Sequence, residues 1–214
     1  MSSWGTAHAS ADNKPKFLST DENAVGAGGS RMNAYATQSG WVMQAGTAAS
    51  GNDNASADPE VLVAIGDLAG ASSTTGLRAP TVTALRYVIG DTATTDMTSG
   101  DGTQRILVEV TWDEEVTVAG SPQIVVVNGN QSGAGYGNHT LTYTATGSTA
   151  NRKRFVATSR SLGNTDVLTT PAAITLNSGT ISDTVVGGTT LAASLDISGV
   201  VQVHTVLSLS LIHI

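Results

Sequence analysis

The sequence predicts an all-β protein in which an antiparallel β-sandwich follows a small N-terminal module. Three observations lead to this fold class. Gly, Ala, Ser, Thr and Val dominate the 214 residues, of which only 13% are charged and 4% are aromatic. Short Thr/Val-rich runs separated by Gly, Asn, Asp and Ser favour strands and tight turns. No segment shows the sustained 3.6-residue periodicity of an amphipathic helix, which excludes a doubly wound α/β enzyme fold.

Residues 1–75 are predicted to form a Gly/Ala-rich attachment or assembly module that is mostly β or irregular. Its predicted strands are Gly40–Gln44 and Glu60–Ile65. Apolar residues are too sparse in this region for an independent core, so we expect partner subunits to complete it. Residues 70–76 have the composition of a flexible linker, and residues 76–80 lead into the second region.

Trp4 and Trp41 are the candidate interface residues of this first module. The chain has only 3 Trp, 4 Tyr and 2 Phe. An exposed Trp here would suit a subunit contact, because aromatic side chains concentrate binding energy at interfaces. The alternative for both residues is a place in a local core.

Residues 81–198 are predicted to form the sandwich, because short strands follow one another at turn-separated intervals. Ile106, Val108, Val110 and Trp112 alternate with polar residues and should share the core face. Phe155 is also expected in the core. The predicted strands are Thr81–Ile89, Ile106–Trp112, Val116–Val118, Gln123–Val127, His139–Thr146, Arg154–Ser159, Ile174–Leu176, the strand at Ile181, and Leu191–Ile197. This number of strands is typical of a β-sandwich.

Residues 199–214 are predicted to begin a further strand or to result from truncation of the gene. Val200–Val206 is interpreted as the first strand of an additional domain. The run Leu209–Ile214 matches the translation of a widely used sequencing-adapter end, which favours an artefact; a genuine apolar strand is the alternative. We therefore assign no function to His204 or His213.

The sequence contains no catalytic or cofactor-binding motif, and we expect a protein that is not an enzyme. The absence of Cys excludes disulfides, thiolate metal sites and a Cys nucleophile. No Gly-x-Ser-x-Gly motif, phosphate-binding loop or His pair with zinc spacing is present. His139 is expected to be a solvated or turn residue at a strand start.

The charge pattern argues against nucleic acid and membrane partners. The formal net charge is −7, whereas phosphate binding needs clustered Lys and Arg. The densest basic cluster, Arg152–Arg154, is interpreted as a solvated strand entrance. No run of 18 apolar residues is present to span a membrane, and the first residues lack a signal peptide's basic and apolar segments.

Carboxylates are the only candidate metal ligands. Asp113, Glu115 and Asp183 lie at predicted strand ends or turns, where they could converge on a calcium ion at one pole of the sandwich. No contiguous calcium-loop motif is present, however, and strand-end carboxylates commonly keep strand edges soluble. We therefore expect no metal and no cofactor, with structural calcium as the minor alternative.

Two motifs give the second region a family resemblance. Val110–Ile124 contains Glu-Val-Thr-Val-Ala-Gly-Ser-Pro, and Ile174–Asp183 reads Ile-Thr-Leu-Asn-Ser-Gly-Thr-Ile-Ser-Asp. Together they resemble the opening and ending of the bacterial Ig-like repeats of large surface adhesins. The resemblance implies an antiparallel sandwich used for spacing, display or adhesion, without catalysis.

The first region resembles the N-terminal part of virion structural proteins from marine tailed phages. The resemblance lies in Met1–Gly5 (Met-Ser-Ser-Trp-Gly), in Gly40–Val42 and in Glu60–Ala64. The stretch between Trp4 and Trp41 is shorter than in that pattern, which leaves the position in the particle open. This resemblance implies attachment to a capsid or another particle surface, with an appended Ig-like domain.

We therefore expect a non-enzymatic structural or decoration protein on the virion surface. Its expected partners are other virion proteins or copies of itself, and weak adhesion to host-surface glycans is a further expectation. The alternative is a fragment of a bacterial adhesin or extracellular filament, located at the cell surface, in which such sandwiches act as spacers.

Overall fold

The computed structural model describes residues 14–19, 31–37, 39–46, 50, 52–65, 79–89, 92–93, 106–129, 137–157, 166–183 and 190–205. Within these ranges the regular structure is β-strand, apart from two 3-10 turns, η2 (Arg31–Asn33) and η3 (Ser198–Val200). The predicted all-β class is confirmed. No described helix is long and apolar enough to cross a membrane.

The first part of the chain forms a three-stranded antiparallel sheet in the order β1-β2-β3. Its strands are β1 (Ala34–Thr37), β2 (Gly40–Met43) and β3 (Glu60–Ala64). The two strands expected from the sequence are present, and β1 was not predicted. Gly40, at φ 120°, lies where a Cβ would collide with the backbone of β3, so this turn requires glycine. We call the described part of residues 14–65 the N-terminal unit.

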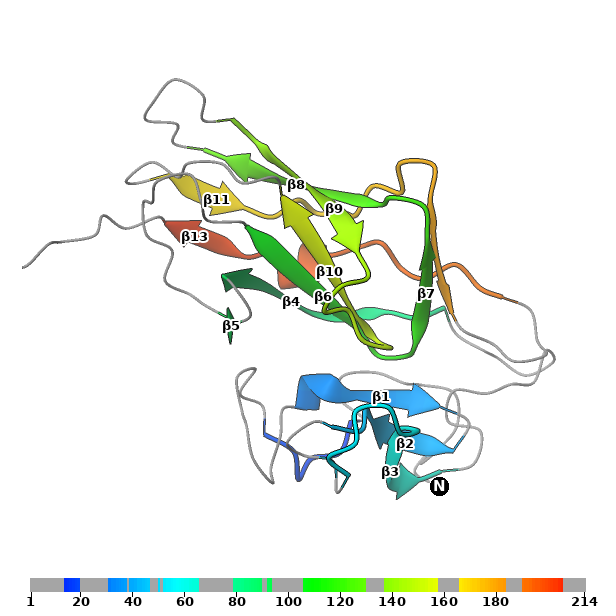
Figure 1. Ribbon diagram of the computed structural model, residues 1–214. Helices are drawn as coiled ribbons and strands as arrows, with labels where there is room; N and C mark the ends of the chain where they lie inside the picture. The colour runs from blue at the N-terminus through cyan, green and yellow to red at the C-terminus, as the bar shows by residue number, and fades with distance from the viewer. Residues whose placement is uncertain are drawn as a thin grey trace, which may run out of the picture.

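The second part is built on an eight-stranded sheet in the order β13-β11-β8-β9-β10-β6-β4-β5 (Figure 1). All of its pairings are antiparallel. The strands are β4 (Val82–Ile89), β5 (Thr92–Ala93), β6 (Leu107–Trp112), β8 (Gln123–Asn128), β9 (His139–Thr144), β10 (Arg152–Ala157), β11 (Val167–Thr169) and β13 (Val203–Thr205). A separate two-stranded ribbon pairs β7 (Val116–Ala119) with β12 (Thr180–Asp183).

This sheet curls until strands far apart in its order meet. Tyr87 on β4 and His204 on β13 stack edge to face, with ring centroids 4.7 Å apart, although five strands separate β4 from β13 in the sheet order. The curled sheet and the ribbon give a β-sandwich-like body, which we call the sandwich. The seam between β4 and β13 closes it.

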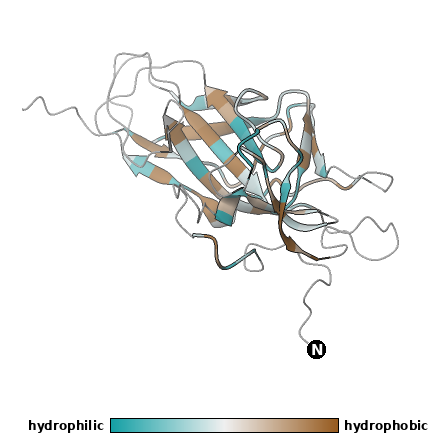
Figure 2. Cartoon of the chain, turned by 60° about the horizontal axis from the view of Figure 1, so that its bottom comes forward, coloured by the Kyte–Doolittle hydropathy of each residue, from teal (hydrophilic) through white to brown (hydrophobic). Residues whose placement is uncertain are grey.

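The core of the sandwich is formed by the inward side chains of both halves of the curled sheet. Hydrophobic and hydrophilic residues alternate along its strands, as Figure 2 shows. Trp112 and Phe155 are fully buried at 0% exposure, which confirms both core predictions. The indole Nε1 of Trp112 donates a hydrogen bond to the carbonyl of Ser194 at 3.0 Å, so its polar edge is also satisfied.

Two expectations about the last part of the chain need correction. Val203–Thr205 pairs with β11 at the edge of the sandwich sheet, so this strand completes the sandwich rather than opening another domain. Residues 206–214, including His213, lie outside the described residues, as does the linker at 70–76. Ile174–Leu176 and Leu191–Ile197 make isolated bridges instead of full strands, because each pairs at single positions only.

Truncating the central indole should strongly destabilise the sandwich. Trp112→Ala removes a fully buried aromatic side chain and leaves Ser194 without its donor, and should lower the free energy of unfolding by about 3–5 kcal/mol. Urea unfolding followed by circular dichroism measures this change. Val203→Ala, at a side chain that is 59% exposed, is the control and should stay within about 0.5 kcal/mol of the parent. Equal effects of the two changes would contradict the core assignment.

Candidate functional site

The N-terminal unit docks on one pole of the sandwich through main-chain contacts. The amide of Ala36 on β1 donates to the carbonyl of Asp113 at 2.8 Å. Ala36 also forms a parallel bridge with Glu114. The edge strand β1 is thereby joined to the chain that leaves β6.

Two side chains at the start of β10, those of Asn151 and Arg152, strengthen this junction. The amide nitrogen of Asn151 lies 3.4 Å from the carbonyl oxygen of Met32 and donates to that of Trp112 at 3.0 Å. Arg152 donates through Nη1 to the side-chain oxygen of Asn33 at 2.9 Å. The turn before β10 therefore holds the 3-10 turn before β1. No sequence motif marks the contacts with Met32 and Asn33, because each joins residues 119 positions apart.

Asp113 organises the sandwich side of the junction. Its carboxylate accepts the backbone amide of Thr81 at 2.7 Å and the Thr81 hydroxyl at 2.6 Å. Its own amide donates to the Thr81 carbonyl at 3.0 Å. Burial raises the pKa of Asp113, and these hydrogen bonds oppose the rise. The first residues of the sandwich are thus fastened to the end of β6.

Three further ionisable groups are buried around this junction. Burial, followed by the charges of Asp113 and Asp183, raises the pKa of Glu114 to about 8. Burial lowers the pKa of Lys14 to about 8, with Asp113 opposing the change. Burial also lowers the pKa of Lys153 to about 8, with Glu115 opposing it. Glu114 is therefore mostly protonated at neutral pH, whereas both ammonium groups are mostly charged.

The structure gives the candidate calcium ligands other roles. The Asp113 carboxylate holds Thr81, and the Asp183 carboxylate accepts the amide of Leu191 at 2.7 Å. Glu115 lies at the same pole, near Tyr35 and Lys153. In the part of the chain that the structure describes, no group of three or more His, Asp or Glu side chains is placed to hold a metal ion. The carboxylates of Asp113 and Asp183 hold backbone amides of their own chain instead.

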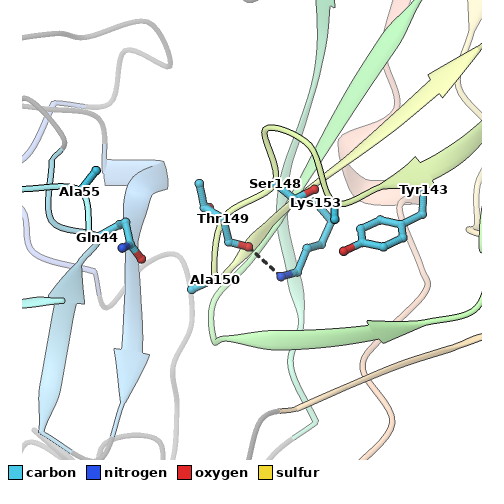
Figure 3. A pocket seen from close by; sticks show the side chains of 8 residues that line it. Gln44, Ala55, Tyr143, Ser148, Thr149, Ala150 and Lys153 are labelled. Carbon is cyan, nitrogen blue, oxygen red and sulfur yellow. Dashed lines mark hydrogen bonds between the residues drawn. The ribbon is translucent and has the colours of Figure 1, made fainter. Parts of the chain in front are cut away.

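A cleft of about 520 Å³ lies between the two units (Figure 3). The N-terminal unit contributes Gln44 and Ala55, and the β9–β10 hairpin contributes the rest of the wall: Tyr143, Ala145, Ser148, Thr149, Ala150 and Lys153. The ammonium of Lys153 donates to the Thr149 carbonyl at 2.7 Å. The hydroxyl of Ser148 donates to the Thr144 carbonyl at 2.7 Å. The polar groups of this wall therefore stabilise the hairpin that carries the junction.

The basic cluster at Arg152–Arg154 is not a solvated strand entrance. These residues open β10, where two arginines lie beside the fully buried carboxylate of Glu109. Arg154 Nε is 2.6 Å and Arg152 Nε is 3.4 Å from that carboxylate, and Arg86 Nε from β4 is 2.7 Å away. Burial would raise the pKa of Glu109, but the three arginines outweigh it and hold the pKa below its usual value.

The remaining site predictions concern aromatic residues and His139. Trp41 is 2% exposed and packs against Ala36, Val63 and Ile65, so it is a local core residue and its indole cannot reach another subunit. Trp4 lies outside the described residues. His139 is buried at the start of β9 rather than solvated, because it pairs with Val126 in the interior of the sheet.

Comparison of the chain with models of protein families, with curated proteins and with solved structures finds no match.

Removing the charge of Glu109 should destabilise the sandwich. Glu109→Gln leaves three arginines close together without their shared carboxylate, and should lower the free energy of unfolding by about 3 kcal/mol. Urea unfolding at neutral pH measures the effect. Asp58→Asn, at an exposed carboxylate, is the matched control and should change little. An unchanged stability of Glu109→Gln would show that the arginines do not depend on this carboxylate.

Stability should fall as pH rises from 5 to 8. Between its usual pKa of 4.5 and its value of about 8 in the folded protein, Glu114 holds a proton that the unfolded chain has released. The folded state is therefore stabilised at low pH, and this stabilisation is lost as pH approaches 8. The lowered pKa values of Lys14 and Lys153 affect the free energy of unfolding only between about pH 8 and pH 10.5. Stability should rise again with pH in that range. A minimum near pH 8 is expected.

Thermal unfolding across this pH range measures the effect. Glu114→Gln should flatten the slope between pH 5 and 8, because the amide cannot ionise. Asp58→Asn should keep the parent slope. A parent protein whose stability rises steadily from pH 5 to 8 would contradict the prediction.

Proposed function

We propose that this chain is a non-catalytic structural protein of a virus particle, in which the N-terminal unit is the attached base and the sandwich projects. One observation carries the proposal. The two units are joined end to end, with β1 nearest the sandwich and β3 farthest from it (Figure 1). A base fixed to a projecting body by backbone hydrogen bonds suits passive display. Its partners are other virion proteins or copies of itself.

The chemistry of the junction supports a passive role. Asp113, Asp183 and Lys153 each bind main-chain groups of the same chain. Such contacts position backbone and need no substrate. The cleft beside them has room for a small saccharide, which is compatible with weak adhesion to host-surface glycans.

The two adhesin-type motifs meet in the β7–β12 ribbon, an arrangement that suits the virion proposal and the alternative of an adhesin spacer equally. A Cβ at Gly120, whose φ is +76°, would lie 2.7 Å from the Cα of Gly179. The side-chain amide of Asn177 donates to the Ser121 carbonyl at 3.2 Å. Glycine is therefore required at both Gly120 and Gly179, because the turns that contain them touch. This observation supports the resemblance of the sandwich, which virion proteins and bacterial adhesins share.

Immunogold electron microscopy with an antibody against the recombinant chain tests the proposal on the source material. Label on the outside of virus particles is the expected result. Label on cell surfaces or filaments, with particles unlabelled, would replace the virion proposal by the adhesin alternative. Pre-absorption of the antibody with the recombinant chain is the control for specific labelling.

A further inference from the structure

The cleft between the two units has the size of a small-ligand site. Its volume of about 520 Å³ lies within the range of about 300–1,000 Å³ that is usual for such sites. One wall comes from the N-terminal unit and the other from the β9–β10 hairpin. Figure 3 shows the hydroxyl of Tyr143 and the ammonium of Lys153 pointing from the hairpin toward the N-terminal unit. A ligand in the cleft would therefore contact both units.

Acceptor groups on the hairpin wall are already occupied. The hydroxyl of Ser148 donates to the Thr144 carbonyl at 2.7 Å and accepts the amide of Arg154 at 2.9 Å. Three main-chain carbonyls of lining residues also accept hydrogen bonds within the protein, so a ligand finds these acceptors taken. The three carbonyls and their donors are Ala145 with the Ser148 amide at 3.1 Å, Thr149 with the Lys153 ammonium at 2.7 Å, and Ala150 with the Val116 amide at 3.1 Å.

Donor groups, in contrast, remain available on this wall. The Lys153 ammonium carries three N–H groups, and the described residues supply an acceptor for one of them, the Thr149 carbonyl. The hydroxyls of Tyr143 and Thr149 have no hydrogen-bond partner among the described residues. A wall with spare donors and occupied acceptors favours a ligand group that only accepts hydrogen bonds, such as a carboxylate.

The charge of the cleft favours the same kind of ligand. Among the described lining residues, Lys153 alone carries a formal charge, and it is only 8% exposed. Burial lowers the pKa of its ammonium to about 8, although the charge of Glu115 opposes this change. Glu115 therefore compensates only part of the desolvation of the ammonium. An anion in the cleft would compensate more of it, because a charge-assisted hydrogen bond stabilises the charged form.

The remaining lining residues suit the ring of a sugar. Ala55, Ala145 and Ala150 place small apolar side chains around the cleft, and Tyr143 adds an aromatic ring. The C–H groups of a sugar can lie against such side chains while its hydroxyls bond to those of Tyr143 and Thr149. Small-ligand sites commonly combine apolar contacts with a few fixed polar groups in this way. A free inorganic anion would leave the apolar contacts unused.

We propose that this cleft binds an acidic saccharide, with the carboxylate of the sugar on the ammonium of Lys153 and its ring between the N-terminal unit and the β9–β10 hairpin. The inference rests on the proposed function, in which weak adhesion to host-surface glycans accompanies display. It adds the class of glycan, namely one that contains carboxylated sugars.

Chemical-shift titration of the isotope-labelled full chain tests the proposal, with methyl glucuronide as the probe and methyl glucoside as the neutral control. Methyl glucuronide should bind with a dissociation constant of about 1 mM and shift the amide signals of Thr149 and Ala150. Methyl glucoside should bind at least about tenfold more weakly, because it lacks the carboxylate. Sodium acetate should also bind more weakly, because it lacks the ring. Absence of glucuronide binding, or equal binding of either control compound, overturns the proposal.

Two variants test the location of the site. Lys153→Met removes the ammonium, keeps an apolar stem, and should weaken glucuronide binding at least about tenfold. Ala55→Trp fills the cleft from an exposed position of the N-terminal unit, so it tests the site without a change in the sandwich and should abolish the shift at Thr149. Ser56→Trp, at the next exposed position and outside the lining, is the matched control and should bind as the parent does. Parent-like binding by both Lys153→Met and Ala55→Trp would contradict this location.

The two proposals fail in different ways. Antibody label on virus particles, together with a chain that does not bind methyl glucuronide, would remove the saccharide site and leave the virion proposal standing. Glucuronide binding by a chain whose antibody labels only cells would keep the site and remove the virion proposal.

Discussion

Asp113 joins three parts of the molecule: the end of β6, the start of the sandwich at Thr81, and β1 of the N-terminal unit. The arrangement of both units depends on this residue. The side chain fixes Thr81, where the sandwich begins, while the Asp113 carbonyl receives β1 of the N-terminal unit. A carboxylate that accepts both a backbone amide and a hydroxyl is well satisfied in spite of its burial. The same residue therefore sets where the sandwich starts and where the N-terminal unit attaches. Loss of its side chain would disturb both units together, because one short loop serves both.

Two of the buried carboxylates, Glu109 and Glu114, are accommodated in opposite ways. Glu109 is kept charged by three arginines on neighbouring strands, whose register places Arg86 and Arg154 directly beside it. Burial, together with the charges of Asp113 and Asp183, raises the pKa of Glu114 instead and leaves it mostly protonated at neutral pH. The first arrangement contributes stability across the neutral range, because its pKa is lowered. The second makes the stability of the junction depend on pH in the neutral range.

The fold class and most strands could be predicted from residues alone, whereas the junction could not. Ile106–Trp112 alternates clearly, and its inward residues form the core as expected. Strand β1 was missed because Ala-Tyr-Ala-Thr has no distinctive pattern, and β11 because it is only three residues long. The basic cluster was misjudged because its partner, Glu109, lies on another strand. Pairings between distant strands determine these sites, and a local pattern cannot show them.

The seam between Tyr87 and His204 has a consequence for how the protein is made. Strand β13 comes last in the described chain, yet it pairs with β11 and contacts β4, the first long strand of the sandwich. A ribosome releases β4 long before β13. The interior of the curled sheet therefore remains open to water for most of synthesis. Final closure awaits the emergence of Val203–Thr205, and the nascent chain must remain soluble until then.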